Sequence, residues 1–169
     1  MNANELREIQ APIKDRYRES PAAAMITLSA EGELADGVAC SVSTGKALVA
    51  AGLHPASGGT GTLACSGDML LQALVACAGV TISAVATALE IHLRGGRLTA
   101  EGDLDFRGTL GVDKAAPVGF KAIRLKVELD TDAGEDRIAK LMQLSERYCV
   151  VYQTLVGGVP VAVEHRRAA

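Results

Sequence analysis

Four cysteines are the residues of this 169-residue chain whose side chains most readily do chemistry, namely Cys40, Cys65, Cys77 and Cys149. A thiolate is a nucleophile and a metal ligand, and two thiols can join in a disulfide. None of the four belongs to a CxxC pair, and the three histidines of the chain provide no zinc spacing. We therefore expect no metal site and no stable disulfide framework, and buried structural cysteine is the simplest interpretation of each.

Cys77 lies near the middle of the stretch 66–92, whose central part carries no charge. Its Leu, Met and Ala residues favour helix, and apolar residues cover every face of that helix. We expect Ser66 to be the N-cap, Asp68 to place a carboxylate in the first turn, and Gly95-Gly96 to stop the pattern. A helix that is apolar all round must be buried, either in a bilayer or in a soluble core.

The uncharged run also reaches the length of a bilayer span. Polar residues inside the run, the high share of Ala and the lack of a flanking Lys/Arg cluster or aromatic belt argue against a membrane. Small residues instead indicate close approach by other backbone, including that of another subunit: Ala73, Ala76, Gly79 and Ala84. We therefore predict a buried central helix.

The composition fits one soluble domain with enough apolar residues for a core. The net charge of -3 comes from mixed charges, and aromatic residues make up 3% of the chain. We therefore expect neither nucleic acid nor membrane as a partner. The polar N-terminus, MNANELREIQ, is typical of neither a signal nor a transit peptide, which predicts a cytoplasmic protein. We predict a single domain over 1–169 with an N-terminal helical extension over about 1–21.

Strands and further helices are predicted on both sides of the central helix. Residues 4–20 are predicted helical, with Pro12 dividing the helix or beginning a second one. Successive antiparallel strands are predicted at 22–34, 37–44 and 46–52, joined by turns that contain Gly. The loop 53–65 is rich in Gly, Ser and Thr, but no Lys-Ser/Thr follows, so a phosphate-binding role is disfavoured.

In the second half of the chain, segments in which apolar and polar residues alternate come first, and segments with helical periodicity follow. Alternating apolar residues predict strands at 97–108 and 120–131. Residues 133–148 are predicted to form an amphipathic helix with Cys149 at or just past its end. A short helix at 150–155 and a closing strand at 159–166 complete the predicted elements.

This order, with a first Cys inside a long apolar helix and a second Cys at the end of a later helix, resembles the OsmC/Ohr family of thiol-dependent peroxidases. The resemblance covers residues 22 to about 165 and depends most on DMLLQALVACAGVT and SERYCVVYQTL. It implies an α+β fold in which antiparallel sheets wrap around the long central helices of an intertwined homodimer. Each active site would lie at the dimer interface.

The resemblance also implies a function without metal or organic cofactor. Cys77 would be the peroxidatic cysteine and Cys149 the resolving cysteine, with organic hydroperoxides as substrates and an external dithiol as reductant. A peroxide is attacked by a thiolate, yet an apolar helix raises the pKa of Cys77. The thiol therefore needs a nearby cation, expected to be an Arg that a carboxylate orients.

The chain departs from the family at the positions that usually supply this pair. Family members usually carry a Glu ten residues before the first Cys, where it pairs with an Arg from the N-terminal part of the chain. Here that position is Gly67, and the nearest carboxylate is Asp68. Arg16 and Arg18 are the candidate cations; we predict Arg18, with Arg107 the next to consider.

Other roles stay open for these residues. Asp68 also fits a simple first-turn carboxylate, Arg18 a solvated surface charge, and Cys65 an alternative partner for Cys77. Where the second Cys of the family is often followed by Pro, Val150 follows here. The alternative function is a non-catalytic dimer that binds a small apolar or thiol-containing ligand. A Cys–His hydrolase that uses His54 has no recognisable motif in its favour.

Overall fold

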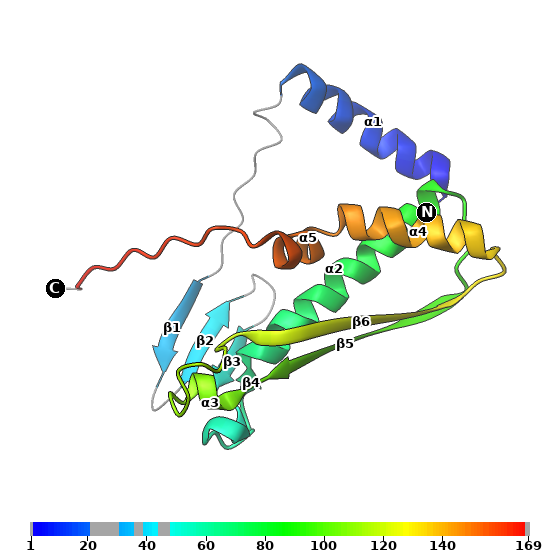
Figure 1. Cartoon of the computed structure of the whole chain (residues 1–169). Helices are drawn as coiled ribbons and strands as arrows, with labels where there is room; N and C mark the ends of the chain where they lie inside the picture. The colour runs from blue at the N-terminus through cyan, green and yellow to red at the C-terminus, as the bar shows by residue number, and fades with distance from the viewer. Residues whose placement is uncertain (1, 21–30, 36–38, 44–47, 168–169) are drawn as a thin grey trace.

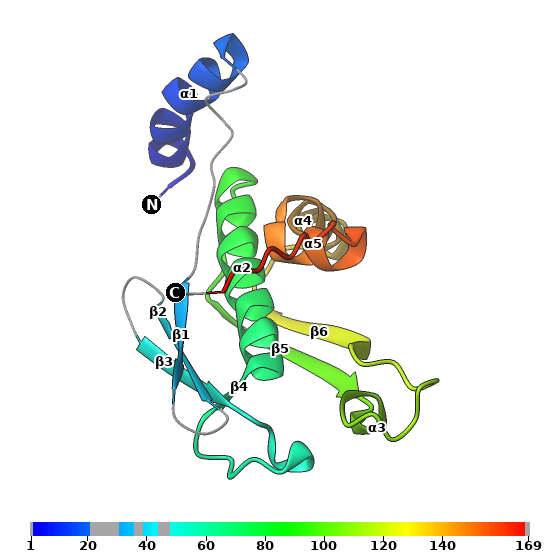
Figure 2. The same cartoon turned by 90° about the vertical axis from the view of Figure 1, so that its left-hand side faces the viewer.

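The computed structural model describes residues 2–20, 31–35, 39–43 and 48–167. Its longest helix, α2 (Ser66–Ala88), is the central helix that the sequence predicts. On one side of α2 lie α4 (Glu135–Tyr148) and α5 (Val150–Gly157), and on another lies the hairpin of β5 (Gly95–Leu104) and β6 (Phe120–Asp130) (Figure 1). Figure 2 shows the sheet of β1 to β4 beside the N-terminal end of α2. The fold is α+β.

The start of α2 differs by one residue from the prediction. Cys65, not Ser66, is the N-cap, and no side chain caps the helix there. The reason is that β4 (Ala64–Cys65) pairs in parallel with β3, which keeps the backbone extended up to Cys65. Asp68 lies in the first turn, as expected.

Beyond the other end of α2, Glu90 adopts a left-handed conformation with φ 55°. This turn leads the chain from α2 toward β5. The Arg137 guanidinium of α4 donates hydrogen bonds to the carbonyls of Leu89 at 2.8 Å and Glu90 at 3.2 Å. A cation thus satisfies carbonyls at the negative end of the helix dipole.

One face of α2 is buried within the chain. Residues spaced four apart form this face: Leu74, Ala78, Ile82 and Ala86. On other faces Val80 is 72% exposed and Leu70 is 38% exposed. α2 is long and apolar enough to cross a membrane, and 28% of its most apolar window is buried. Within one chain only the face of α2 that touches its neighbours is buried, and the predicted cover of its other faces by another subunit stays a prediction.

Two sheets carry the strands. β1 (Glu31–Ala35), β2 (Ala39–Ser43) and β3 (Leu48–Gly52) pair antiparallel in sequence order, as predicted. The earlier part of the predicted first strand, residues 22–30, lies outside the described residues. In the second sheet β5 pairs antiparallel with β6, with Leu98 opposite Val127. The residues Leu125, Val127 and Leu129 alternate with exposed neighbours, which confirms the period-two pattern.

The strand predicted at 97–108 ends at Leu104 instead. Asp105 then caps the one-turn helix α3 (Phe106–Thr109), because its carboxylate accepts a hydrogen bond from the Arg107 N–H at 3.2 Å. The same carboxylate binds the Arg107 guanidinium at 2.6 Å. A local capping interaction therefore overrides the alternation of the sequence.

The two ends of the chain correct two further predictions. α1 (Ala3–Glu19) is one helix with Pro12 inside it, so Pro12 does not divide it. Proline removes one N–H donor, and an exposed helix can leave the freed carbonyl to water. The closing strand at 159–166 is also wrong, because residues 159–167 form neither helix nor strand. A strand needs a neighbour for its backbone hydrogen bonds, and no described strand pairs with this segment.

Candidate active site

The structure brings Cys77 and Cys149 together. Cys77 lies half-buried in the middle of α2, whereas Cys149 is 2% exposed and joins α4 to α5. The two side chains lie close enough for each to shift the pKa of the other, and both are free thiols. These two sulfurs therefore form one site where α2 packs against the α4–α5 junction.

Cys149 is both the C-cap of α4 and the N-cap of α5. Its φ of -74° and ψ of 109° are extended, so the chain changes direction there and a new helix begins at Val150. The first N–H groups of a helix have no acceptor within that helix. Two of them, from Val150 and Val151, lie close enough to the Cys77 sulfur to lower its pKa. The N-terminal end of α5, which is the positive end of its dipole, therefore lies near Cys77.

These contacts shift the two thiol pKa values in opposite directions. Burial acts to raise the pKa of Cys77, but hydrogen bonds from the Val151 and Val150 N–H groups and from the Cys149 and Thr81 side chains lower it below its ordinary value. Burial raises the pKa of Cys149, and the adjacent Cys77 raises it further. Of the pair, Cys77 is therefore the thiol that ionises more readily, and Cys149 is the one that holds its proton more tightly.

Thr81 lies one helical turn beyond Cys77 on the same face of α2. Its hydroxyl donates to the Cys77 carbonyl at 2.8 Å and also lies within hydrogen-bonding reach of the Cys77 sulfur. The hydroxyl thus holds the backbone beside the reactive sulfur. The largest contributions that lower the pKa come from hydrogen-bond donors, and the expected Arg is not among them.

Asp68 is not brought to Cys77 within one chain. Nine residues of helix separate them, which places the two side chains on opposite faces and about 14 Å apart along the axis. Asp68 instead lines a shallow cavity with Leu71, Gln72 and Ala100. A Glu side chain at Gly67 would meet the Phe120 ring and other apolar groups, so the position of the usual family Glu is apolar here.

The predicted cations also lie elsewhere. Arg18 and Arg16 belong to α1, which leans away from the rest of the chain in both views, and their side chains lie outside the described part of the structure (Figures 1 and 2). Arg107 is held by Asp105 at 2.6 Å and by Asp113 at 3.4 Å. Its guanidinium is therefore engaged by two carboxylates of its own loop.

The remaining candidates take structural positions. Cys65 caps α2 twelve residues before Cys77, about 18 Å away along the axis, so it is not placed as its partner. His54 accepts a hydrogen bond from the Ala56 N–H at 3.1 Å and stacks on Phe106 with ring centroids 5.0 Å apart. This engagement in a loop gives no support to the hydrolase alternative.

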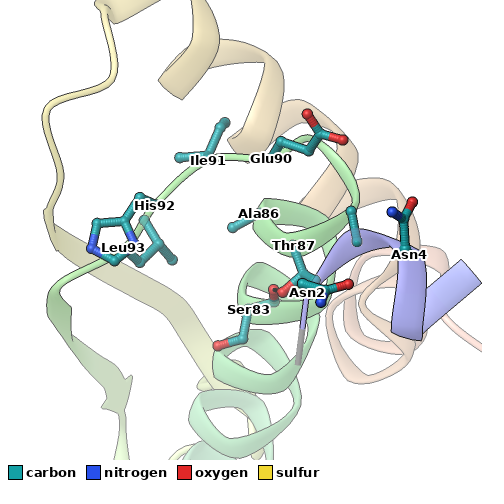
Figure 3. A pocket seen from close by; sticks show the side chains of 10 residues that line it. Asn2, Asn4, Ser83, Ala86, Thr87, Glu90, Ile91, His92 and Leu93 are labelled. Carbon is teal, nitrogen blue, oxygen red and sulfur yellow. Dashed lines mark hydrogen bonds between the residues drawn. The ribbon is translucent and has the colours of Figure 1, made fainter.

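Two further cavities adjoin α2. A smaller, partly open cavity of about 150 Å³ lies between α2, β6 and α4, with Cys149 in its wall. An open cavity of about 610 Å³ lies at the C-terminal end of α2, between Ser83 and Thr87 of α2, the segment that holds His92, and the first turn of α1 (Figure 3). No described cysteine lines the open cavity, whereas the smaller one adjoins Cys149 of the thiol pair.

Sequence reasoning missed the main-chain donors that contact Cys77. The N–H groups of Val150 and Val151 have no side-chain signature, and the sequence marks Thr81 only as a polar residue of a helix. One signal was present: a short predicted helix begins directly after Cys149, and a helix start offers free N–H groups to a nearby anion.

Comparisons with known proteins agree with this fold. A model of the family described as OsmC-like protein matches residues 59–164, more than half of the chain. Among solved structures, an OsmC-like protein from Mycoplasma pneumoniae has a TM-score of 0.66 at 19% identity, covering 78% of this chain and 89% of its own. A search of curated protein sequences found no match.

Two further solved structures share the fold. An organic hydroperoxide resistance protein OsmC from Legionella pneumophila has a TM-score of 0.61 at 19% identity, covering 79% of this chain and 91% of its own. A Vibrio cholerae protein, solved with captopril bound in one of the active sites, has a TM-score of 0.54 at 17% identity, covering 79% and 88%. At these identities the likeness shows the fold alone.

Proposed function

The chain belongs to the OsmC-like protein family, and within that family we propose that it is a thiol-dependent peroxidase that reduces organic hydroperoxides. One observation carries the proposal: the Cys77 sulfur lies beside the Cys149 thiol and the first N–H groups of α5, and these groups lower its pKa. A thiolate held by donors, next to a thiol that keeps its proton, has the two groups that peroxide reduction needs.

In the first step the Cys77 thiolate attacks the terminal oxygen of the hydroperoxide. The O–O bond breaks, its electron pair leaves on the alkoxide, and Cys77 becomes a sulfenic acid. The alkoxide takes a proton and departs as an alcohol. Cys149 stands beside the reacting sulfur with a thiol proton and is placed to supply it.

In the second step Cys149 attacks the Cys77 sulfur. A disulfide forms, and the sulfenic oxygen leaves as hydroxide, which becomes water on protonation. The sum is two thiols and one hydroperoxide converted to one disulfide, one alcohol and one water. An external dithiol then returns the enzyme to its reduced state. Rapid resolution protects Cys77 from oxidation to the sulfinic acid.

The proposal includes a homodimer in the cytoplasm. The face of α2 that carries Val80 is apolar and uncovered in one chain, and an interface between two copies would bury it. Asp68 lies away from the Cys77 of its own chain, and Arg18 belongs to the outlying helix α1. We place their predicted catalytic role in the assembled dimer, where they would act toward the second chain.

The name of the Legionella pneumophila relative, an organic hydroperoxide resistance protein, supports this choice of substrate. The first test is direct. One equivalent of cumene hydroperoxide should consume two thiols per chain, and peptide mapping should find Cys77 joined to Cys149. The Cys77→Ser variant should lose turnover, and Cys149→Ser should be oxidised at Cys77 and proceed to sulfinic acid. Free thiols at both positions after excess peroxide would rule the proposal out.

A second candidate function has one observation in its favour. The Vibrio cholerae relative holds captopril, a thiol compound, in one of its active sites. A non-catalytic dimer that binds a thiol-containing ligand would use the same cysteines without turnover. The thiol count after peroxide treatment separates the two functions.

A further inference from the structure

Arg137 joins the start of α4 to the far end of α2. Its guanidinium donates hydrogen bonds to the carbonyls of Leu89 at 2.8 Å and Glu90 at 3.2 Å. These carbonyls lie just past the last turn of α2, where a helix has no N–H groups of its own to satisfy them. We call these two hydrogen bonds the Arg137 clamp.

The thiol pair forms a second contact between the same two helices. Cys77 lies in the middle of α2, and Cys149 follows the last residue of α4. Each thiol shifts the pKa of the other, so the two lie side by side. The start of α4 thus meets the end of α2, and the end of α4 meets the middle of α2. The two helices therefore run in opposite directions along each other (Figure 1).

The two contacts are equally spaced on the two helices. Twelve residues separate Cys77 from Leu89, and twelve separate Arg137 from Cys149, which is about 18 Å of helix in each case. Between the two contacts, Leu141 of α4 is 0% exposed and belongs to one buried cluster with Ile82 and Ala86 of α2. A close-packed core transmits a displacement and does not absorb it. A shift of α4 at the clamp would therefore move Cys149 relative to Cys77.

Disulfide formation is sensitive to such a shift. The two Cα atoms of a disulfide must lie within about 4.4–6.8 Å of each other. Moving α4 along α2 by one residue displaces Cys149 by about 1.5 Å, a large part of that range. The apolar contacts of Leu141 have no preferred direction, whereas hydrogen bonds to two carbonyls favour one position of the donor. The clamp therefore adds the directional restraint that the buried cluster lacks.

We propose that Arg137 is a positioning residue for the thiol pair, because it fixes α4 along α2 at the place where Cys149 can join Cys77. This inference rests on the proposed function, since it concerns the step in which Cys149 resolves the Cys77 sulfenic acid. In that step the S–S bond forms and the S–O bond breaks, and the hydroxide that leaves takes up the thiol proton as water.

The test measures the equilibrium between the two thiols and their disulfide in glutathione buffers. Oxidised glutathione accepts the two electrons of the thiol pair and leaves as two molecules of reduced glutathione, so no peroxide is needed. Acid quenching and peptide mapping give the fraction of chains in which Cys77 is joined to Cys149. Consumption of thiols by cumene hydroperoxide is scored separately and decides the proposed function.

Three variants separate positioning from general stability. Arg137→Met removes the donors and keeps an apolar stem, and Arg137→Lys keeps a cationic donor. Arg124→Met is the matched control, because Arg124 is held by Asp103 on the β5–β6 hairpin, away from α4. The free energy of unfolding of the reduced protein is measured for all three. A purely structural role would lower this free energy and leave the thiol–disulfide equilibrium unchanged.

We expect the equilibrium constant for disulfide formation to fall about fivefold in Arg137→Met, the effect of one hydrogen bond exposed to solvent. Arg137→Lys should stay within about twofold of the wild type, and so should Arg124→Met. If Arg137→Met does not fold, Arg137→Gln, whose shorter side chain withdraws from the carbonyls, is measured with the same expectation. A constant in the folded variant equal to that of the wild type, or an equal fall in Arg124→Met, would overturn the proposal.

Discussion

Gln153 of α5 donates a side-chain hydrogen bond to the Glu146 carbonyl of α4 at 2.8 Å. The bond crosses the junction at Cys149 and fixes the start of α5 relative to the end of α4. Because the N–H groups of Val150 and Val151 reach the Cys77 sulfur from this start, Gln153 is a positioning residue for a thiolate that it does not touch.

Replacing Gln153 with Ala should loosen the α4–α5 junction and raise the pKa of Cys77. At a pH below the wild-type midpoint, the rate of Cys77 alkylation by iodoacetamide should fall by roughly fivefold, the effect of one hydrogen bond of about 1 kcal/mol. Gln143→Ala is the matched control, since Gln143 accepts a bond from Lys140 at 3.0 Å on α4, away from the junction. Equal rates in the two variants would contradict the positioning role.

Thr81→Val should also raise the pKa of Cys77, because the hydroxyl within reach of the sulfur is lost while the shape of the side chain is kept. Thr87→Val serves as control, because the Thr87 hydroxyl makes the same kind of bond to the Ser83 carbonyl, at 2.8 Å. The readout is the thiolate absorbance near 240 nm against pH. The prediction fails if the midpoint moves no further in Thr81→Val than in Thr87→Val.

The reaction with peroxide should persist to lower pH than that of a free cysteine. Because the pKa of Cys77 is lowered, we expect the midpoint of the decline in rate to lie below that of an ordinary thiol. The lowered pKa also affects the free energy of unfolding. The groups that favour the Cys77 thiolate stabilise the folded chain at pH values above the unfolded-state pKa, and this stabilisation is lost as pH falls through the folded-state pKa of Cys77. Stopped-flow rates of Cys77 oxidation, with Cys77→Ser as blank, give the midpoint. A midpoint at or above that of free cysteine would refute the assigned direction.

Val80→Asp should dissociate the proposed homodimer. An unpaired charge in an apolar interface costs on the order of 3 kcal/mol, which weakens association by more than a hundredfold. Val112→Asp makes the same change at a 73% exposed loop position and should leave the assembly intact. Light scattering at micromolar concentration measures the mass. A stable folded monomer for the wild type would remove the dimer from the proposal.

Asp105→Asn should release the loop that begins at α3. The Arg107 guanidinium lowers the pKa of Asp105 to about 2, so this carboxylate stays charged throughout the ordinary range. Its contribution to stability is present above the unfolded-state pKa and is lost only as pH falls to about 2. Limited proteolysis within 109–119 should be faster in the variant, and Asp132→Asn, on an exposed ion pair, is the control. Unchanged cleavage would show that Asp105 does not hold the loop.

The parts of the fold that the sequence predicted are those that depend on local periodicity. The apolar run of α2 and the alternation of β6 appear where expected, because each pattern is a property of a single element. The end of α4 at Cys149 follows its predicted position for the same reason. Local patterns alone therefore assign both thiols to the correct elements.

Other features depend on contacts between segments far apart in the sequence, which local patterns do not predict. The groups that lower the pKa of Cys77 include main-chain N–H groups of a helix that begins 73 residues further along the chain. Because every residue except proline has such an N–H group, the sequence alone could not show that these donors, and not a cation, lie beside Cys77. The predicted closing strand failed for a related reason, because Val161 and Val163 alternate correctly but lack a pairing strand among the described residues. Whether Asp68 and Arg18 act in catalysis stays a prediction for the assembled protein.

Because α2 is only partly buried in one chain, we expect the stability of the fold to depend on the protein concentration. With 28% of its most apolar window buried in one chain, part of the free energy that keeps the helix in place would come from association with another copy in the proposed homodimer. By mass action, the thermal midpoint should then rise with the amount of protein, and dilution alone should favour the unfolded chain. Newly made chains would gain full stability only after meeting a second one, so the supply of finished enzyme would depend on the square of the concentration of unpaired chains.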